Sequence, residues 1–335
     1  MNRTVSTPGK ITILGEYAVM YGKTGVSAAL QERVKVTAKD HQGIRISLNG
    51  KTEEYSRDKA KELFLQANSM IRRKDVEGLD MFLEKRFPPL AALAWKCMEL
   101  KGANEGVELD ILYSLPDAAG LGASSAISSA VSAAIIGYKT EVEKRKVFDA
   151  SMFGDSIAHL TPSGLDCETT IKGGFLSYRK GFNPNRIDVD YELPIVVGDT
   201  GKRSKAVDMV KKVEDLRTGD PRANEWLNEL DEAAREGLEA IKKQDIQELA
   251  FNINKSQELL RHLKVSTPEI ENLIITSLRA GAIAAEITGQ GGGGAMFALC
   301  EKPEDVEKVA EAIRKEGGSV IKTVIGGPGL KVDER

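Results

Sequence analysis

One stretch constrains this chain more than any other, because a glycine turn in it runs directly into a helix of small residues. The stretch is Leu115 to Ile135, LPDAAGLGASSAISSAVSAAI. Such a turn leaves backbone N–H groups unpaired beside the positive end of the helix dipole. It therefore predicts a phosphate-binding loop, with a capped helix behind a tight turn as the alternative. The hydroxyls of Ser124 and Ser125 can add a donor to phosphate or a ligand to Mg²⁺, which prefers oxygen.

A second glycine-rich stretch, Glu286 to Cys300, carries four consecutive glycines at 291–294. A flexible linker is one interpretation of such a run. The composition of a linker should stay polar, however, and here an apolar run resumes directly after the glycines. The pattern therefore favours backbone that is packed closely against another loop or a nucleotide.

The third stretch, His159 to Thr170, contains a Pro-Ser-Gly turn at 162–164 that sets the orientation of Asp166. An aspartate after a turn is commonly a helix cap or a solvated residue. Together with Lys10 and a phosphate-binding loop it can instead serve catalysis. A kinase needs a carboxylate to accept the hydroxyl proton and a cation to stabilise the transferring charge.

Two other segments have the composition of anion sites. Gly22-Lys23-Thr24 resembles the end of a Walker-A loop, but that pattern needs a glycine at position 17, where the chain has Tyr17. We therefore expect a turn there, leading into a strand. The run Lys202 to Lys205, KRSK, is either a solvated charge run or a cationic rim for an anionic ligand.

Length and composition narrow the class of protein. With 335 residues two domains are expected, and a net charge of −3 gives no general attraction to nucleic acid or to a membrane surface. The absence of CxxC and HExxH spacings disfavours a disulfide framework and a zinc enzyme. Without a signal peptide or a membrane-length apolar run, we expect a cytoplasmic protein in a reducing compartment. Its assembly stays open between a monomer and a homodimer.

Hydrophobic periodicity predicts strands and helices in irregular alternation, which indicates an α+β fold. The predicted strands are 10–14, 34–38, 107–113, 172–177, 193–197 and 319–325. The predicted helices are 58–73, 88–100, 124–138 and 304–315, with a further one whose apolar face is Leu227, Leu230, Ala234, Leu238 and Ile241. A polar Asn-Pro stretch at 181–190 places a boundary between two domains, 1–185 and 186–335.

Taken in order, three segments resemble the motifs of the GHMP kinases. They are Pro8 to Val19 (PGKITILGEYAV), Gly120 to Ala126 (GLGASSA) and Thr288 to Gly294 (TGQGGGG). Their order and spacing make the resemblance specific. Within the family, YGKTGVSAAL, GDTGKRSKAVDMVKKV and NINKSQELLRHLKVSTPEIENLI are similar to segments of compact archaeal mevalonate kinases. The resemblance implies a ribosomal-S5-like N-terminal domain and a ferredoxin-like C-terminal domain, with ATP and substrate in the cleft.

The same resemblance implies a role for each motif residue. Asp166 would be the catalytic base, and Lys10 would lower the pKa of the substrate hydroxyl and stabilise the transferring phosphoryl group. Mg²⁺ would be held by Ser124, with Ser125 as a contender, and by Asp155, where mevalonate kinases usually carry Glu. The phosphates of ATP would lie on Gly120, Leu121, Gly122, Ala123, Ser124, Ser125 and Ala126.

The implied substrate is mevalonate. A phosphorylated mevalonate, a sugar or a sugar phosphate is the alternative, because mevalonate kinases usually have His at the Tyr17 position and phosphomevalonate kinases often have Tyr. A non-catalytic sensor is less favoured, since it needs none of the catalytic residues. A decarboxylase of this fold is less favoured as well, since the first and third motifs fit the kinase branch better. Substrate contacts are expected from Glu16, Tyr17, Ser163, Thr200, Gly292 and Gly293.

Overall fold

A single long strand organises the sheet of this protein. In the computed structural model, which describes residues 2–117, 119–179, 181–189 and 191–334, β2 (Thr24–His41) pairs antiparallel with β1 (Asn2–Leu14) over most of its length. The register shifts between Pro8 and Lys10, so β1 has an irregularity beside the lysine of the first motif. The predicted strands 10–14 and 34–38 are confirmed as parts of these longer strands.

Strands from both halves of the chain join one sheet, in the order β4-β3-β5-β2-β11-β8-β10-β9. On another path β6 pairs with β2 and β7, and β12 pairs with β1. The predicted strands 107–113, 193–197 and 319–325 correspond to β5, β8 and β11. The bounds are β3 (Ile44–Leu48), β4 (Lys51–Tyr55), β5 (Gly106–Leu112), β6 (Phe175–Arg179), β7 (Asn185–Ile187), β8 (Leu193–Asp199), β9 (Ala284–Thr288), β10 (Ala295–Leu299), β11 (Ser319–Ile325) and β12 (Lys331–Glu334).

One predicted strand needs correction. The range 172–177 was expected to be extended throughout, but Lys172 is the last residue of α6 (Leu165–Lys172) and β6 begins only at Phe175. Gly173 and Gly174 lie between them with φ of 68° and 69°. These left-handed conformations turn the chain from the helix into the strand, which only glycine does readily.

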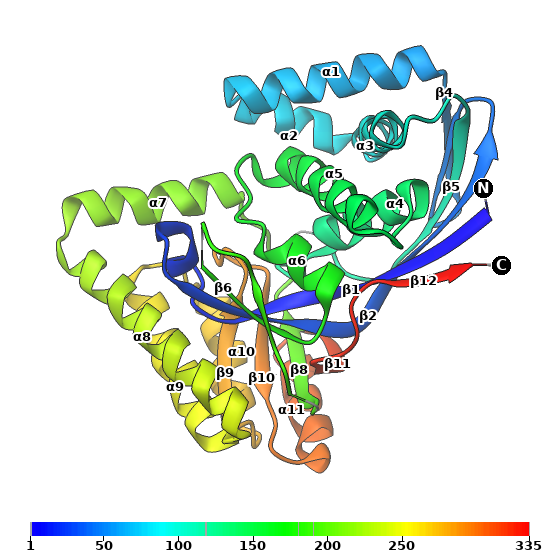
Figure 1. Cartoon of the computed structure of the whole chain (residues 1–335). Coiled ribbons are helices and arrows are strands. Elements are labelled where there is room, and N and C mark those ends of the chain that lie inside the picture. The colour runs from blue at the N-terminus through cyan, green and yellow to red at the C-terminus, as the bar shows by residue number, and fades with distance from the viewer. Residues whose placement is uncertain (1, 118, 180, 190, 335) are drawn as a thin grey trace.

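The helices of the first half form a layer over one part of the sheet (Figure 1). They confirm the predicted helices 58–73, 88–100 and 124–138, with ends within two residues. The small side chains of α4 let β1, β2, α3 and α5 pack around it, so it is buried on nearly all sides. The bounds are α1 (Arg57–Arg73), α2 (Val76–Glu84), α3 (Phe87–Lys101), α4 (Ala123–Ile136) and α5 (Glu141–His159), followed by α6.

In the second half, α10 and α11 pack on strands β8 to β11, while α8 and α9 pack on each other and reach β2 and β9. The predicted apolar face of α8 is confirmed, with Leu238 half-buried and its other four members buried. The predicted helix 304–315 corresponds to α11. The bounds are α7 (Ala206–Gly219), α8 (Arg222–Lys243), α9 (Ile246–His262), α10 (Pro268–Arg279) and α11 (Pro303–Lys315).

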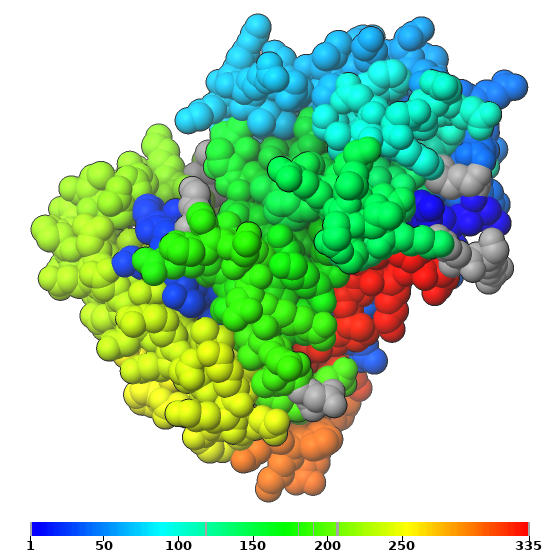
Figure 2. Space-filling model, in the orientation of Figure 1, coloured from blue at the N-terminus to red at the C-terminus, as the bar shows by residue number. Residues whose placement is uncertain are grey.

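The two halves of the chain are tied together at several points. Ile325 of β11 pairs with Leu30 of β2, and Tyr17 and Ala18 lie in a core cluster built mainly from the second half. Ala18 starts the short 3-10 helix η1 (Ala18–Tyr21), which contacts α8, and Figure 2 shows this blue segment beside the yellow-green atoms of α7 and α8. Because β7 spans position 185 and β12 returns to β1, the division into 1–185 and 186–335 stays a prediction. None of the described helices is long and apolar enough to cross a membrane.

Candidate active site

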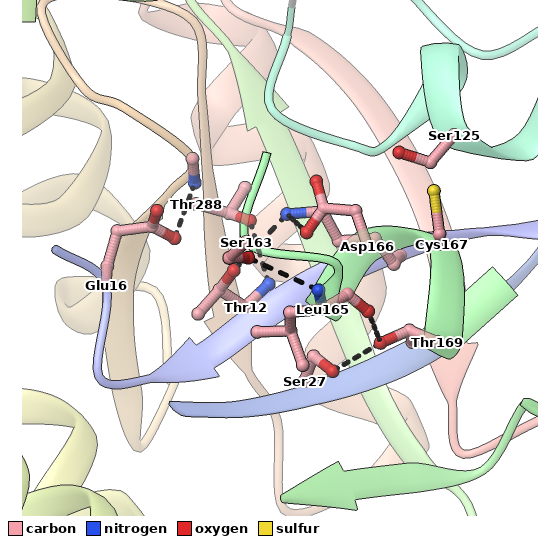
Figure 3. A network of polar contacts seen from close by, with 12 residues as sticks. Thr12, Glu16, Ser27, Ser125, Ser163, Leu165, Asp166, Cys167, Thr169 and Thr288 are labelled. Carbon is pink, nitrogen blue, oxygen red and sulfur yellow. Dashed lines mark hydrogen bonds and ion pairs between the residues drawn. The ribbon is translucent and has the colours of Figure 1, made fainter. Parts of the chain in front are cut away.

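The sheet brings a buried lysine against the aspartate of a short helix. Lys10 of β1 is only 4% exposed, and its Nζ lies 2.9 Å from Oδ1 of Asp166 in the first turn of α6. The same Nζ donates to Oγ1 of Thr12 at 3.3 Å, and Figure 3 shows Thr12, Asp166 and Thr288 in this network. Burial by itself would lower the pKa of Lys10, but the carboxylates of Asp166 and Glu16 outweigh it and raise the pKa. The lysine is therefore charged at neutral pH.

Gly122 makes room for this lysine. Its φ is 69°, and a Cβ atom there would lie 2.6 Å from Cγ of Lys10. The backbone N–H of Lys10 donates to the carbonyl of Leu121 at 2.9 Å, which ties the first motif to the predicted phosphate loop. Directly after Gly122, α4 begins, and no side chain of the described residues caps it. The N–H groups of its first turn are thus available to an anion. Residue 118, which precedes the loop in the sequence, lies outside the described residues.

Two serines and a histidine converge on Asp155 of α5. The carboxylate is 1% exposed, and its Oδ1 accepts hydrogen bonds from Oγ of Ser125 at 2.7 Å and from Oγ of Ser124 at 3.0 Å. Nε2 of His159, one helical turn later, lies 3.3 Å from Oγ of Ser124 and 3.8 Å from Oδ1 of Asp155. Burial raises the pKa of Asp155, His159 opposes the rise and Asp166 adds to it. A cation at this point would stabilise the charged form of the carboxylate.

The third motif packs backbone to backbone against the phosphate loop. A Cβ atom on Gly120 would lie 2.3 Å from the carbonyl oxygen of Thr288, and one on Gly289 would lie 2.7 Å from Cα of Gly120. Glycine is therefore required on both sides of this contact, and the predicted close packing of the glycine-rich stretch is confirmed. A small pocket lies at the contact, lined by Ala119, Gly120, Ser204, Thr288, Gln290, Gly291, Gly293 and Gly294.

The end of the first motif also contacts the third. Oε2 of Glu16 accepts a hydrogen bond from the N–H of Gly289 at 3.2 Å, and the hydroxyl of Tyr17 donates to the carbonyl of Gln290 at 2.5 Å. Tyr17 is 3% exposed, has φ 61° and ψ −46°, and its pKa is raised by burial and by Glu16. The hydroxyl of Tyr17 thus makes a contact inside the protein, and its predicted contact with substrate stays a prediction.

Other predicted substrate residues also make bonds within the protein. Oγ of Ser163 accepts from the N–H of Leu165 at 3.2 Å, and Oγ1 of Thr200 donates to the carbonyl of Gly294 at 3.0 Å. The N–H of Gly292 donates to the carbonyl of Val265, and Gly293 lines the small pocket. Contacts of these residues with a substrate stay predictions.

The three basic side chains of the run 202–205 are exposed and each is paired with a carboxylate, so a contact of this run with an anionic ligand stays a prediction. Arg203 binds both carboxylate oxygens of Asp199 at 2.7 Å, a two-bond geometry that fixes the guanidinium. Its two lysines are also paired with carboxylates, and one of these carboxylates belongs to α2 in the first half of the chain. The three pairs are Lys202–Glu269, Arg203–Asp199 and Lys205–Asp80.

Sequence reasoning assigned no function to His159. The signal that could have found it is its position four residues after Asp155, since residues at that spacing share a face of a helix. In the part of the chain that the structure describes, no three His, Cys, Asp or Glu side chains form a group that could hold a metal. Any cation at Asp155 must therefore be held partly by hydroxyl groups or by a bound ligand.

Known proteins resemble this chain in both sequence and fold. Residues 238–319 match the family model "GHMP kinases C terminal". A mevalonate kinase of Thermococcus sibiricus is 32% identical to this chain over all of it and 99% of its own length. The crystal structure of the Methanococcus jannaschii mevalonate kinase superposes with a TM-score of 0.81 at 20% identity, covering 98% of this chain and 99% of the other. That of the L. major mevalonate kinase in complex with R-mevalonate gives 0.76 at 19% identity, covering 97% and 96%.

The fold, the order of the three motifs and the full-length similarity all indicate a GHMP kinase. The predicted α+β fold of the GHMP kinases is confirmed by the similarity to the solved structures, and the family model matches within the second half. The chain belongs to the GHMP kinase family, in its mevalonate kinase branch.

Proposed function

We propose that this chain transfers the γ-phosphoryl group of ATP to a hydroxyl of mevalonate. The observation that carries the proposal is the 2.9 Å contact between the buried Lys10 and Asp166, beside the uncapped start of α4. A carboxylate, a cation and an anion site then lie together, as phosphoryl transfer requires. The relatives named mevalonate kinase, and the similar fold solved with R-mevalonate, support the substrate.

The residues divide the chemistry between them. The substrate oxygen forms a bond to the γ-phosphorus, the bond from that phosphorus to the β,γ-bridging oxygen breaks, and ADP leaves. Asp166 accepts the proton of the attacking hydroxyl. Lys10, charged and held against Asp166, lowers the pKa of that hydroxyl and stabilises the negative charge on the transferring group. The N–H groups at the start of α4 hold the phosphates.

The chain also has donors that fit Mg²⁺. Oγ of Ser124 and Oδ1 of Asp155 are oxygen donors 3.0 Å apart, which matches neighbouring ligands at about 2.1 Å from an octahedral ion. Ser124 is half-buried and Ser125 is fully buried, which supports Ser124 as the ligand. Bound there, Mg²⁺ would neutralise charge on the phosphates of ATP.

Two observations favour unphosphorylated mevalonate over its phosphates. The hydroxyl of Tyr17 would suit a substrate phosphate, but it donates a hydrogen bond to the backbone carbonyl of Gln290 instead. The cations Lys202, Arg203 and Lys205 are each paired with a carboxylate.

The cysteines bear on the compartment. Cys97, Cys167 and Cys300, all within the described residues, are buried and form no disulfide. Free thiols are typical of reducing compartments. This supports our proposal that the protein acts in the cytoplasm.

ADP release by the purified protein tests the proposal, with Mg-ATP and mevalonate, mevalonate 3-phosphate, mevalonate 5-phosphate, homoserine or galactose as acceptors. We expect turnover with mevalonate, and slower turnover or none with the others. Preferred turnover of either phosphate would assign the chain a different substrate. Binding without ADP release from any acceptor would make it a sensor.

A further inference from the structure

A buried carboxyl group lies inside the second half of the chain, where β9 packs on α9 (Figure 1). It belongs to Glu286 of β9, which is 1% exposed. Its Oε1 accepts a hydrogen bond from Oγ of Ser256 at 2.8 Å. Its Oε2 has no hydrogen-bond partner among the described residues. The bond from Ser256 therefore accounts for only half of this carboxyl group.

The same face of α9 carries a second buried oxygen without a donor. Asn252 lies one helical turn before Ser256 and is fully buried. Its Nδ2 donates to the carbonyl and to Oε1 of Glu248, at 2.9 and 3.1 Å, so these two acceptors fix the orientation of the amide. Oδ1 is then left without a partner in the described part of the chain. The cluster therefore lacks a donor, and a proton on Oε2 of Glu286 would supply one.

The charged groups around Glu286 do not neutralise it. The carboxylate of Glu16, which follows β1, repels a second negative charge here. From α9 comes another carboxylate, Glu248, and Lys10 of β1 already has a carboxylate partner. The remaining elements on β9 are β10, whose Phe297 lies opposite Glu286, and α10, which packs on the other face of the sheet.

Burial therefore decides the charge of this group. It raises the pKa of Glu286 well above the ordinary range, while the bond from Ser256 opposes the rise and Glu16 adds to it. A buried carboxylate with no cation paired to it among the described residues costs far more free energy than a neutral carboxyl group. A hydrogen bond from water would satisfy Oε2, but it would supply no opposite charge.

Glu286 also stands directly before the third motif. Side chains two positions apart on a strand share a face, so Glu286 and Thr288 point the same way. Oγ1 of Thr288 accepts a hydrogen bond from the N–H of Thr12 at 3.4 Å, and its carbonyl lies against Gly120 of the phosphate loop. The bond from α9 to Glu286 thus fixes the end of the strand from which the motif contacts the loop.

We propose that Glu286 is a positioning residue of this kinase: it carries a proton on Oε2 at neutral pH, and in this neutral form it anchors β9 to α9 and holds the third motif against the phosphate loop. Ionisation places an unpaired charge at this anchor and loosens it. The effect on turnover rests on the proposed function, whereas the proton and the anchor do not.

Infrared spectroscopy of the full chain tests the proton directly. At neutral pH exposed carboxyl groups are ionised, so the C=O stretching band of a protonated carboxyl group comes from a buried one. We expect such a band from the native protein and its loss in Glu286→Gln. The control Glu311→Gln, which changes an exposed carboxylate of α11, should keep it. A native spectrum without a band that depends on Glu286 would overturn the proposal.

The pH dependence of unfolding gives a second readout. Because the pKa of Glu286 is raised in the folded protein, its carboxyl group contributes stability that is fully present below the unfolded pKa of about 4.3 and is lost as pH rises through the folded pKa. The folding equilibrium constant of the native protein, divided by that of Glu286→Gln, should fall by up to about tenfold per pH unit within this window. The same ratio for Glu311→Gln should stay nearly constant. A constant ratio for Glu286→Gln would contradict the proton.

Binding of a fluorescent ATP analogue at neutral pH tests the positioning. Glu286→Gln keeps a neutral group with a donor and an acceptor, so its dissociation constant should stay close to that of the native protein. Glu286→Leu removes both, and we expect up to about tenfold weaker binding, the equivalent of one net hydrogen bond. Native affinity in both variants would overturn the positioning role and leave the proposed function intact. If the variants behave as expected but no acceptor is turned over, the proposed function alone is overturned.

Discussion

Replacing Tyr17 by phenylalanine removes one oxygen atom from the contact between the first and third motifs. In the native protein that hydroxyl donates to the carbonyl of Gln290 at 2.5 Å, and the ring is almost fully buried. The variant leaves the carbonyl of Gln290 without this donor, at a hydrogen bond that is partly buried. Such an unsatisfied buried group costs about 1–3 kcal/mol, and we expect the free energy of unfolding to fall by that amount.

A matched variant separates this effect from the loss of any tyrosine hydroxyl. Tyr21, four residues later, donates its hydroxyl to Oε2 of Glu214 at 3.0 Å in a half-exposed position. In Tyr21→Phe, water can replace the lost donor, so the loss should stay below about 1 kcal/mol. Both variants keep the aromatic ring, so the packing of the core is nearly unchanged.

Equilibrium unfolding in urea measures the stability, and steady-state kinetics with mevalonate measures the site. If Tyr17 serves the contact with Gln290, the variant loses stability and its KM for mevalonate changes little. If Tyr17 instead faces the substrate, KM rises while the free energy of unfolding stays at the native value. That second outcome would refute the structural assignment and restore the interpretation from the sequence.

Three further outcomes are expected. Asp166→Asn should lower kcat by about 10²–10⁴, the usual contribution of a general base, while a fluorescent ATP analogue still binds; near-native turnover would exclude it as the base. Gly122→Ala should cut turnover because the new Cβ displaces Lys10, whereas Gly102→Ala, with a similar positive φ but open space, should lose only about 1–2 kcal/mol of stability. Equal activity in both variants would contradict this. Because the pKa of Lys10 is raised in the folded protein, its charged form stabilises the fold. This stabilisation is fully present below the unfolded pKa of about 10.4, and it is lost as pH rises through the folded pKa. The stability difference from Lys10→Met should therefore shrink in the alkaline range, and a constant difference would count against it.

Local patterns in the sequence were sufficient for several helices and strands and for the chemistry of the motifs, but not for elements such as α2, α5 and β3. Helix α11 and strand β11 follow the predicted ranges to within one residue, because amphipathic spacing and turn residues act over a few positions. The glycines of the phosphate loop and the third motif were recognisable for the same reason. Only the strand after Lys172 was misplaced, since two glycines with positive φ delay its start.

The partners of individual side chains depended on the tertiary structure. Tyr17 and Gln290 are 273 positions apart, and the pairing of Lys205 with Asp80 likewise joins opposite halves of the chain. No local pattern encodes such contacts, because they depend on how β2 and its neighbours bring distant loops together. The sequence by itself determined the family, part of the elements and the residue types available for phosphoryl transfer. Only the packed structure decided that Tyr17 is interior, that the basic run is paired, and that His159 stands beside Ser124 and Asp155.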